Sequence, residues 1–280
     1  MENILLICVN YGSYDVMHQY LKSIDIATRS VTDMCKIEVA VVDNTPDNYQ
    51  DVDLSSYVFS GRVFPFHINY GYMGGAVKAL EEMGETYTKG FDYVIISNVD
   101  LVLSDTFFRD LLQNPQNNIG WVVPSIYRIN YNNSNENPFL LNKPTKLKYN
   151  LLMLLYKYPI LNGLYTKYFS TRKRVKYKNN RDILDTFGGE IYAGLGSLFI
   201  FTRQFVKKNY PLTFPSFMYG EELFYGEMVR SMGLKTYYVP NIKAYDICGI
   251  STGKLTNSRL CKMNLDSMKI IKTYLYNKRK

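Results

Sequence analysis

Hydrophobic runs alternate along this chain with segments in which apolar residues recur at helical spacing. Asn3–Val9 and Ile37–Val42 are continuous apolar runs, which is typical of strands buried on both faces of a parallel sheet. The shorter segments predicted as strands are Val63–Phe66, Asp92–Ser97 and Gly120–Pro124. The segments predicted as helices are Asp15–Ile24, Ala76–Tyr87 and Asp105–Leu112, the last with Ser104 as its N-cap. This alternation predicts an α/β fold with a doubly wound, mostly parallel sheet.

The second half of the chain has a less regular pattern. Structure of β type is predicted again at Phe187–Phe201, which is punctuated by glycines, and at Lys235–Val239. Helices are predicted at Arg203–Lys208, Glu221–Met232 and Lys262–Tyr276. We therefore predict one domain over residues 1–280, in which 126–186 is an insertion between an N-terminal half (1–125) and a C-terminal part (187–280).

The positive charge of the chain is concentrated in this insertion. The 280 residues carry a formal net charge of +8, and the segment Lys143–Arg181 contains eleven lysines and arginines and no acidic residue. The rest of the chain is therefore slightly negative in sum. This distribution excludes a domain that binds nucleic acid through a generally basic surface, so no nucleic-acid partner is expected.

Cysteine usage and the N-terminus bear on the cellular compartment. The cysteines lie far apart, without the spacing of metal ligands, and we interpret all of them as reduced thiols: Cys8, Cys35, Cys248 and Cys261. Met1–Asn3 lacks the basic start of a signal peptide, and the longest apolar cluster, Asn150–Tyr156, is too short to cross a bilayer. These features predict a cytoplasmic protein, either soluble or peripheral on the inner face of the cell membrane.

Four polar clusters each follow a predicted strand: Asn10-Tyr11, Asp43-Asn44, Asn69–Gly75 and Asn98–Asp100. Because the carboxyl ends of parallel strands lie at one edge of a sheet, these clusters are expected to line one concave ligand site. There, Asp43 is suited to accept a hydrogen bond from a base or a ribose hydroxyl. The carboxylate of Asp100 is suited to hold a divalent cation against a phosphate. The alternative for Asp100 is a structural role as the cap of the following helix.

Two further motifs add candidate chemistry. Gly71, Gly74 and Gly75 would let a phosphate approach the backbone ahead of a helix, although a tight turn is the simpler explanation. Glu221 and Glu222 open a predicted helix, where the helix dipole favours acidic residues whatever their function. In an active site such a carboxylate can serve as a general base, and the proximity of Glu221 is expected to raise the pKa of Glu222.

Taken in order, these motifs resemble the family 2 inverting glycosyltransferases of GT-A fold, especially the bacterial rhamnosyltransferase-like branch. The resembling motifs are Asn10-Tyr11, Val41-Val42-Asp43-Asn44, Asn69-x-Gly71-x-x-Gly74-Gly75, Ser97-Asn98-Val99-Asp100, Gly194-x-Gly196-Ser197, and Phe217-x-Tyr219-x-Glu221-Glu222 followed by Arg230 and Gly233. They cover roughly residues 3–125 and 187–252. The resemblance implies transfer of a sugar from a nucleotide-diphosphate sugar donor to a saccharide or polyprenyl-linked saccharide acceptor, in bacterial surface polysaccharide synthesis.

The resemblance also implies roles for individual residues. The residues implied in donor binding are Asn10, Tyr11, Asp43, Asn69, Gly71, Gly74, Gly75 and Asn98. Those implied on the acceptor side are Gly194, Gly196 and Ser197. Asp100 would belong to the family's metal-binding motif and hold Mn²⁺ or Mg²⁺ on the diphosphate. Glu222, with Glu221 beside it, aligns with the family's catalytic carboxylate and would deprotonate the acceptor hydroxyl in a single inverting displacement.

The chain departs from the family pattern at three places. Asn98-Val99-Asp100 offers one carboxylate where many relatives have an acidic pair, and Ala76, Val77 and Ala79 stand where many have Asn and Gly. Asp246 occupies a late position that is often His in the family. Asp246 is either a second ligand of the cation or an ordinary loop residue.

The basic insertion has two interpretations. Its lysines and arginines are interleaved with tyrosines and with the apolar run Leu151–Leu155, a combination that fits an anionic membrane surface contacted through Lys143–Arg181. The alternative is a small helical subdomain with a solvated basic face that covers the acceptor site. For the whole chain, the alternatives to a glycosyltransferase are a nucleotidyltransferase on the same kind of sheet and a non-catalytic binder of nucleotide sugars or membrane surfaces.

Overall fold

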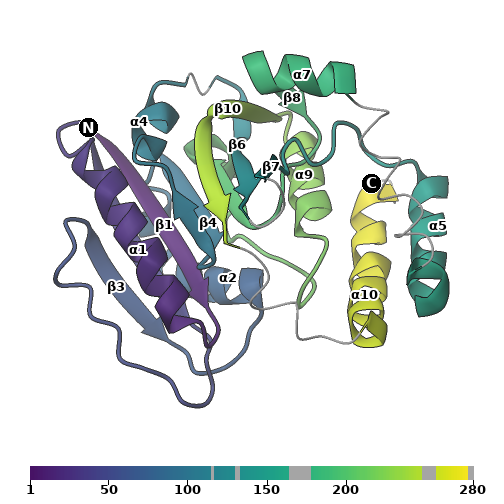
Figure 1. The fold of residues 1–280 in the computed structure, drawn as a ribbon, viewed down its shortest axis with the longest axis horizontal. Helices are drawn as coiled ribbons and strands as arrows, with labels where there is room; N and C mark the ends of the chain where they lie inside the picture. The colour runs from purple at the N-terminus through teal and green to yellow at the C-terminus, as the bar shows by residue number, and fades with distance from the viewer. Residues whose placement is uncertain (115–116, 130–132, 164–177, 248–256, 277–280) are drawn as a thin grey trace.

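A single twisted sheet of ten strands forms the centre of the molecule (Figure 1). The computed structural model describes residues 1–114, 117–129, 133–163, 178–247 and 257–276. The strands are β1 (Glu2–Asn10), β2 (Cys35–Asp43), β3 (Ser60–Pro65), β4 (Tyr93–Asn98), β5 (Leu101–Leu103), β6 (Ile119–Arg128), β7 (Ser134–Asn135), β8 (Gly189–Ile191), β9 (Leu198–Thr202) and β10 (Lys235–Asp246). The helices are α1 (Tyr14–Arg29), α2 (Tyr72–Met83), α3 (Glu85–Thr88), α4 (Phe107–Leu112), α5 (Lys146–Lys157), α7 (Lys178–Phe187), α8 (Arg203–Lys208), α9 (Glu221–Ser231) and α10 (Asn257–Tyr276).

The strand order is β3-β2-β1-β4-β9-β6-β10-β5, with β7 on β6 and β8 on β10. Strands β3, β2, β1 and β4 are parallel neighbours, and β6 and β10 are also parallel. Strand β9 runs antiparallel between β4 and β6. The mostly parallel α/β sheet predicted from the hydrophobic pattern is therefore confirmed.

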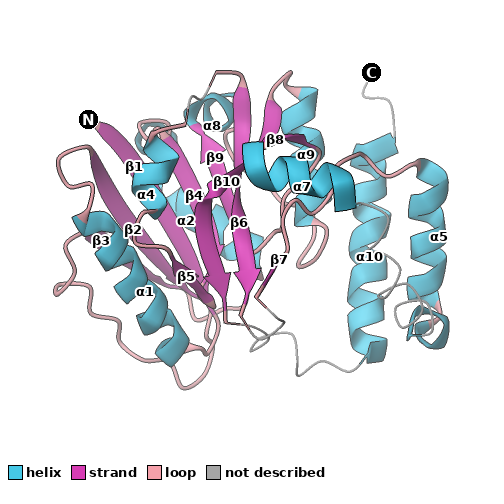
Figure 2. Cartoon of the chain, turned by 45° about the horizontal axis from the view of Figure 1, so that its top comes forward, coloured by secondary structure: helices cyan, strands magenta, loops and turns pink. Residues whose placement is uncertain are grey.

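Helices cover both faces of the sheet (Figure 2). One buried cluster joins α1 and α4 to the sheet, and the other joins α2, α8, α9 and α10 to the opposite face. The second cluster is rich in stacked aromatic rings: the ring centroids of Trp121 and Phe199 lie 4.8 Å apart and those of Phe201 and Tyr225 lie 5.0 Å apart. These large apolar side chains make the face that carries α9 rigid.

Helices α5 and α10 lie side by side beyond the end of the sheet (Figures 1 and 2). The Tyr149 hydroxyl of α5 donates to the carbonyl of Met268 in α10 at 3.0 Å, and Tyr149 is buried. The first part of the predicted insertion is thus held by the C-terminal helix. In the described part of the chain, no helix combines the length and hydrophobicity needed to cross a bilayer.

Several predicted elements have different bounds in the structure, and three of these differences have a clear physical cause. The helix predicted over Ala76–Tyr87 begins earlier, at Tyr72, and is broken at Gly84, whose φ of +84° ends α2 before the short α3. Helix α4 begins after Thr106 and not at Ser104, because Leu101–Leu103 pairs with β10 as a strand. Strand β6 continues to Arg128, past the predicted end at Pro124, because it stays paired with β10.

Cys8, Cys35 and Cys261 are buried thiols, and Cys8 lies in β1 as predicted. Burial raises the pKa of the Cys8 thiol to about 12, so this thiol is neutral at physiological pH. Cys248 lies outside the described residues, as do Arg172–Lys176 of the basic segment.

Candidate active site

The carboxyl ends of β1, β2 and β4 bring three predicted site residues to one edge of the sheet. Asn10 ends β1 opposite Asp43, which ends β2, and Val9 is in register with Asn98 at the end of β4. This edge is where ligands bind in open α/β sheets. Asn10, Asp43 and Asn98 therefore lie at the same edge of the sheet.

Asp43 lies below the surface of this edge, in a saturated hydrogen-bond network. Tyr14 donates its hydroxyl to Oδ2 at 2.6 Å, while Asn10 Nδ2 and the Thr45 hydroxyl and amide donate to Oδ1 at 3.2, 2.6 and 3.1 Å. Only 1% of Asp43 is exposed. The carboxylate locks the ends of β1 and β2 together, so it shapes the floor of the site. The Tyr11 side chain, in contrast, is half exposed at the rim.

The glycine motif forms the start of α2 and not a loop ahead of it. Asn69 Oδ1 accepts from the Gly71 amide at 3.0 Å, and Asn44 Nδ2 donates to the Gly71 carbonyl at 2.9 Å. A Cβ on Gly75 would lie 2.8 Å from Asn44 Nδ2, so Gly75 lets α2 pack directly on the end of β2. Gly74, in the first turn, is less crowded. These glycines bring the helix N-terminus to the candidate site.

Asp100 and Asp246 come together although they are far apart in the sequence. Strand β5 pairs antiparallel with β10, which places Leu101 opposite Asp246, and the Ile247 amide donates to the Asp100 carbonyl at 3.0 Å. Arg128 Nε lies 3.8 Å from Asp246 Oδ2. Burial, and then the charge of Asp246, raise the pKa of Asp100 to about 6.

This pair of carboxylates fits a divalent cation. Carboxylate oxygen is a preferred ligand of Mg²⁺ and Mn²⁺, and a cation between the two side chains would relieve the repulsion that raises the Asp100 pKa. No group of three or more His, Cys, Asp or Glu side chains suited to a metal occurs in the described residues. The remaining ligands would therefore come from the substrate and from water, as is usual where a cation bridges a protein to phosphates.

Glu222 stands in the first turn of α9 and faces the loop that leads into β9. Its Oε1 accepts a hydrogen bond from the Gly196 amide at 3.2 Å, and a Cβ on Gly196 would lie 2.8 Å from that oxygen. The Glu222 carboxylate thus leaves no room for a side chain at Gly196. Glu222 is partly exposed, and burial raises its pKa. A carboxylate with a raised pKa and an open side has the properties of a general base.

Glu221 is more deeply buried than Glu222 and plays a different part. Its Oε1 accepts from the Tyr219 amide at 2.9 Å, which closes a turn in which Tyr219 and Gly220 have φ values of +69° and +91°. Burial, and then the charge of Glu222, raise the pKa of Glu221. The turn fixes the orientation of α9 and with it the position of Glu222.

Tyr72, which was not predicted from the sequence, lies in the first turn of α2 and reaches the end of β4. Its hydroxyl donates to the Ile96 carbonyl at 2.9 Å. Burial first, and the charges of Glu221 and Asp100 among the further causes, raise the pKa of Tyr72 well above its usual value. The same hydroxyl lies 3.4 Å from the Ser197 carbonyl, so Tyr72 joins the end of β4 to the segment that leads into β9. An isolated tyrosine after a glycine carries no sequence signal that would have identified it.

Gly194 and Ser197, the two ends of the segment predicted to line the acceptor, make different contacts. A Cβ on Gly194 would lie 2.5 Å from Val123 Cγ1, so this glycine packs on β6. The Ser197 carbonyl accepts from the Asn98 amide at 3.0 Å, which joins the segment to the end of β4. The Ser197 hydroxyl and the Tyr219 hydroxyl are buried without a hydrogen-bond partner among the described residues. Buried polar atoms without a partner are uncommon in folded proteins, so these two hydroxyls mark the segment as one where a polar group of a ligand could be accommodated.

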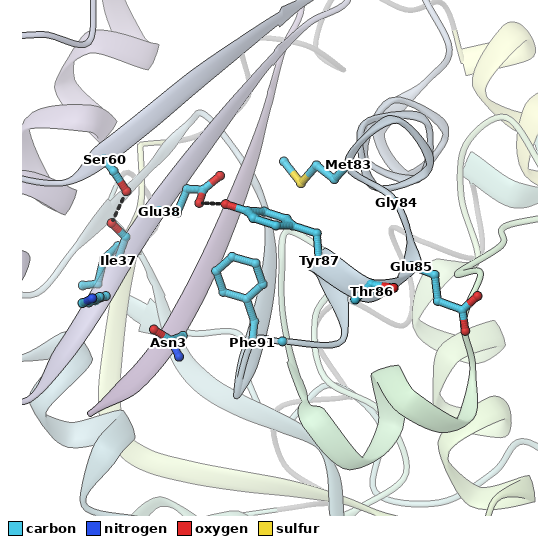
Figure 3. A pocket seen from close by; sticks show the side chains of 12 residues that line it. Asn3, Ile37, Glu38, Ser60, Met83, Gly84, Glu85, Thr86, Tyr87 and Phe91 are labelled. Atoms are coloured by element: carbon cyan, nitrogen blue, oxygen red, sulfur yellow. Dashed lines mark hydrogen bonds between the residues drawn. The ribbon is translucent and has the colours of Figure 1, made fainter.

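A hollow of about 760 Å³ lies elsewhere, at the opposite edge of the sheet (Figure 3). It is lined by residues at the amino ends of the strands, such as Asn3, Glu38 and Ser60, and by the α2–α3 break. The Glu38 carboxylate accepts from Tyr87 and forms an ion pair with Arg62 at 2.8 Å. The Glu38 carboxylate of this hollow is therefore already paired within the protein.

No protein-family model and no curated protein sequence matches the chain. Solved structures do match. S. aureus TarS 1–349 in complex with UDP-GlcNAc has a TM-score of 0.57 at 12% identity, over 100% of this chain and 68% of that one. GalNAc-T7 with UDP, GalNAc and Mn²⁺ has a TM-score of 0.53 at 13% identity, over 99% of this chain and 51% of that one. A longer S. aureus TarS chain has a TM-score of 0.50 at 13% identity, over 89% of this chain, which spans only 37% of it. The chain therefore has the GT-A-like glycosyltransferase fold that these structures share.

Proposed function

We propose that this protein is an inverting glycosyltransferase that moves a sugar from a nucleotide-diphosphate donor to a saccharide or polyprenyl-linked saccharide. The observation that carries the proposal is that the end of β4, which leads to Asp100, is joined to the segment beside Glu222. The Asn98 amide donates to the Ser197 carbonyl at 3.0 Å, and the Gly196 amide donates to Glu222 Oε1 at 3.2 Å. Asp100 and Asp246 form one pair, and Glu221 and Glu222 form the other. One pair suits a diphosphate with its cation, and the other suits an acceptor hydroxyl.

The donor nucleotide is assigned to the ends of β1 and β2. Tyr11, which is exposed at the rim, would contact the base or ribose, and the buried Asn10 and Asp43 would build the floor beneath it. Asn98 with the start of α2 would face the sugar diphosphate. The solved complexes of this fold support the assignment, because TarS was solved with UDP-GlcNAc and GalNAc-T7 with UDP and Mn²⁺. Asn69, Gly71, Gly74 and Gly75 would act by building the α2 N-terminus.

Asp100 and Asp246 would hold Mn²⁺ or Mg²⁺. When bound, the cation supplies positive charge that stabilises the departing diphosphate. The protein contributes an oxygen-rich edge on which the donor diphosphate lies in a fixed orientation. Arg128, beside Asp246, limits the negative charge of the pair when the donor is absent.

Glu222 is the proposed base. Its carboxylate takes the proton of the acceptor hydroxyl, and the oxygen attacks the anomeric carbon from the face opposite the diphosphate. The new glycosidic bond forms as the bond to the diphosphate oxygen breaks, so the nucleoside diphosphate leaves and the configuration inverts. Gly196 and the α9 turn hold the carboxylate in place, and Gly194, Gly196 and Ser197 flank the acceptor.

The setting that we propose is bacterial surface polysaccharide synthesis in the cytoplasm, in the manner of rhamnosyltransferase-like enzymes. A peripheral association with the inner face of the membrane, through Lys143–Arg181, would bring a polyprenyl-linked acceptor to the site. The localised charge of that segment supports this setting.

The test is transfer from labelled donors, followed by NMR assignment of the product's anomeric configuration. Glu222→Gln is expected to lower kcat by about 10²–10⁴-fold and to leave donor binding intact. Glu190→Gln, the same change at an exposed glutamate in an ion pair with Lys235, should be neutral. Retention of configuration, or full activity of Glu222→Gln, would contradict the mechanism. Turnover of nucleoside triphosphates in place of nucleotide sugars would favour the nucleotidyltransferase alternative.

A further inference from the structure

Helix α5 has an apolar face that no other part of the described chain covers. Leu147, Leu151 and Leu154 are 81%, 53% and 50% exposed, at the spacing of one helix face. Helix α5 ends at Lys157, and Tyr158 caps it in an extended conformation. We name the three leucine side chains the apolar stripe. Figure 2 shows α5 at the outer end of the molecule, beyond α10. Exposed leucines at regular helical spacing are typical of a surface that contacts a partner.

The opposite face of α5 packs inside the protein. Tyr149 is buried against α10, and Leu152, Met153 and Tyr156 pack on the cluster that joins α9 and α10 to the sheet. At 3.6 residues per turn, these side chains point away from the stripe. The stripe is therefore an additional apolar face and not the core-facing side of a poorly packed helix.

Lysines flank the stripe on both sides. At 100° per residue, Lys148 lies on one side of the leucines, and Lys146 and Lys157 lie on the other. All three lysines are exposed, and the sequence from Lys143 to Arg181 has no acidic residue. An apolar stripe with lysines on both sides is the arrangement of a helix that lies in the plane of an anionic membrane, with leucines inserted and ammonium groups at the headgroups.

Helix α10 links α5 to the catalytic turn. Helix α10 contacts both α5 and α9, the helix that carries Glu222. A Cβ on Gly220 would lie 2.4 Å from Ile271 Cδ1, and the Ser267 hydroxyl donates to the Met218 carbonyl, so α10 clamps this turn. A bilayer against the stripe would thus lie only one or two helix diameters, ~10–20 Å, from the base.

We propose that the apolar stripe docks the protein on an anionic lipid bilayer, and that the acceptor is a lipid-linked saccharide whose reacting hydroxyl lies close to the headgroups. The docking on a bilayer is inferred from the apolar stripe and the lysines beside it. The second part rests on the proposed function, because it takes Glu222 as the base. The short span from stripe to base selects an acceptor in which few sugars separate the lipid from the new bond.

Sedimentation with vesicles tests the docking without catalysis. The full chain is expected to bind phosphatidylcholine vesicles that contain phosphatidylglycerol and to bind pure phosphatidylcholine vesicles much more weakly. Leu151→Glu is expected to weaken binding about tenfold or more, because it removes the insertion of one leucine. Ile26→Glu is the matched control, since Ile26 is 49% exposed on α1, and its binding should be unchanged. Lys148→Gln is expected to weaken binding about fivefold.

The outcomes separate the possible occupants of the stripe. Absence of vesicle binding by the folded wild-type chain would overturn the proposal. A stable dimer of wild type in sedimentation velocity, converted to monomer by Leu151→Glu, would also overturn it, because the stripe would then bind a second copy. Equal binding of Leu151→Glu and Ile26→Glu to anionic vesicles would show that another surface makes the contact.

The acceptor part has its own measurement. Leu151→Glu should lose transfer to a lipid-linked acceptor in vesicles and keep transfer to the same acceptor in detergent, whereas Glu222→Gln should bind vesicles normally and transfer in neither. Loss of both activities in Leu151→Glu would contradict the docking role. Inactivity of the wild type on every acceptor, with vesicle binding intact, would contradict the proposed function and leave the docking in place.

Discussion

Gly71 packs so closely against the Phe217 backbone that there is no room for a side chain at this position. One substitution can test this contact. Gly71 precedes α2 with φ +76° and ψ 174°, a conformation that is essentially restricted to glycine. A Cβ there would lie 2.2 Å from the Phe217 carbonyl oxygen, which belongs to the loop leading to Glu221. Gly71→Ala must therefore both strain α2 and push this loop away.

Gly84 provides the matched control at the other end of the same helix. It has nearly the same conformation, φ +84° and ψ 159°, but a Cβ would meet no atom within 4 Å. Gly84→Ala is expected to lower the free energy of unfolding by about 1–3 kcal/mol, because alanine is strained in this backbone conformation. Gly71→Ala adds the displacement of a packed backbone, for which we expect a further 1–3 kcal/mol or so.

The assay is equilibrium urea unfolding of both variants, with donor transfer measured in parallel. The expected result is a lower free energy of unfolding for Gly71→Ala than for Gly84→Ala, together with a loss of transfer that Gly84→Ala does not show. Equal losses of unfolding free energy in the two variants would show that Gly71 does not pack against the loop that leads to Glu221 and Glu222.

Three further predictions concern the carboxylates. Gly196→Ala would place a methyl group 2.8 Å from Glu222 Oε1 and should lower kcat at unchanged unfolding temperature, which steady-state kinetics and calorimetry would check. Burial raises the pKa of Glu222, and a general base acts in its deprotonated form. We therefore expect kcat to rise with pH through an apparent pKa above 4.5, which belongs to the Glu221–Glu222 pair as a whole. A kcat that does not change with pH would contradict this expectation. In metal-free protein the pKa of Asp100 is raised from 3.8 to about 6, so the folded state binds this proton more tightly than the unfolded state does. The resulting contribution to the free energy of unfolding is fully present below pH 4 and is lost as the pH rises through 6. Asp100→Asn should therefore raise stability at pH 8 by at most about 3 kcal/mol and leave it unchanged at pH 4, as measured by urea unfolding with chelator.

The sheet could be predicted because buried parallel strands leave a strong pattern. Ile4–Val9 and Val39–Val42 are apolar on both faces, and the polar residue after each run marks the strand end. The start of α2 was not predictable in the same way. Gly74 and Gly75 have low helix propensity, and only the packing of Gly75 on Asn44 explains why they are helical.

The site could be predicted where its residues follow strands, as Asp43 and Asp100 do. Pairing of Asp100 with Asp246 depended on β5 joining β10, a contact between distant segments that periodicity does not encode. The Tyr72 hydroxyl reaches the Ile96 carbonyl through tertiary packing alone. The sequence also indicated that Glu221 would raise the pKa of Glu222, whereas burial is the main cause for both side chains.

The most direct test of the central claim is calorimetric titration of UDP-, GDP- and dTDP-linked sugars into the wild type, with and without Mn²⁺. We expect one nucleotide-diphosphate sugar to bind in a metal-dependent manner. Asp100→Asn should weaken this binding, whereas Asp266→Asn, the same change at an exposed aspartate, should not. Absence of binding to every donor by a folded protein, or equal binding by Asp100→Asn, would contradict the assignment of this sheet edge as a donor site.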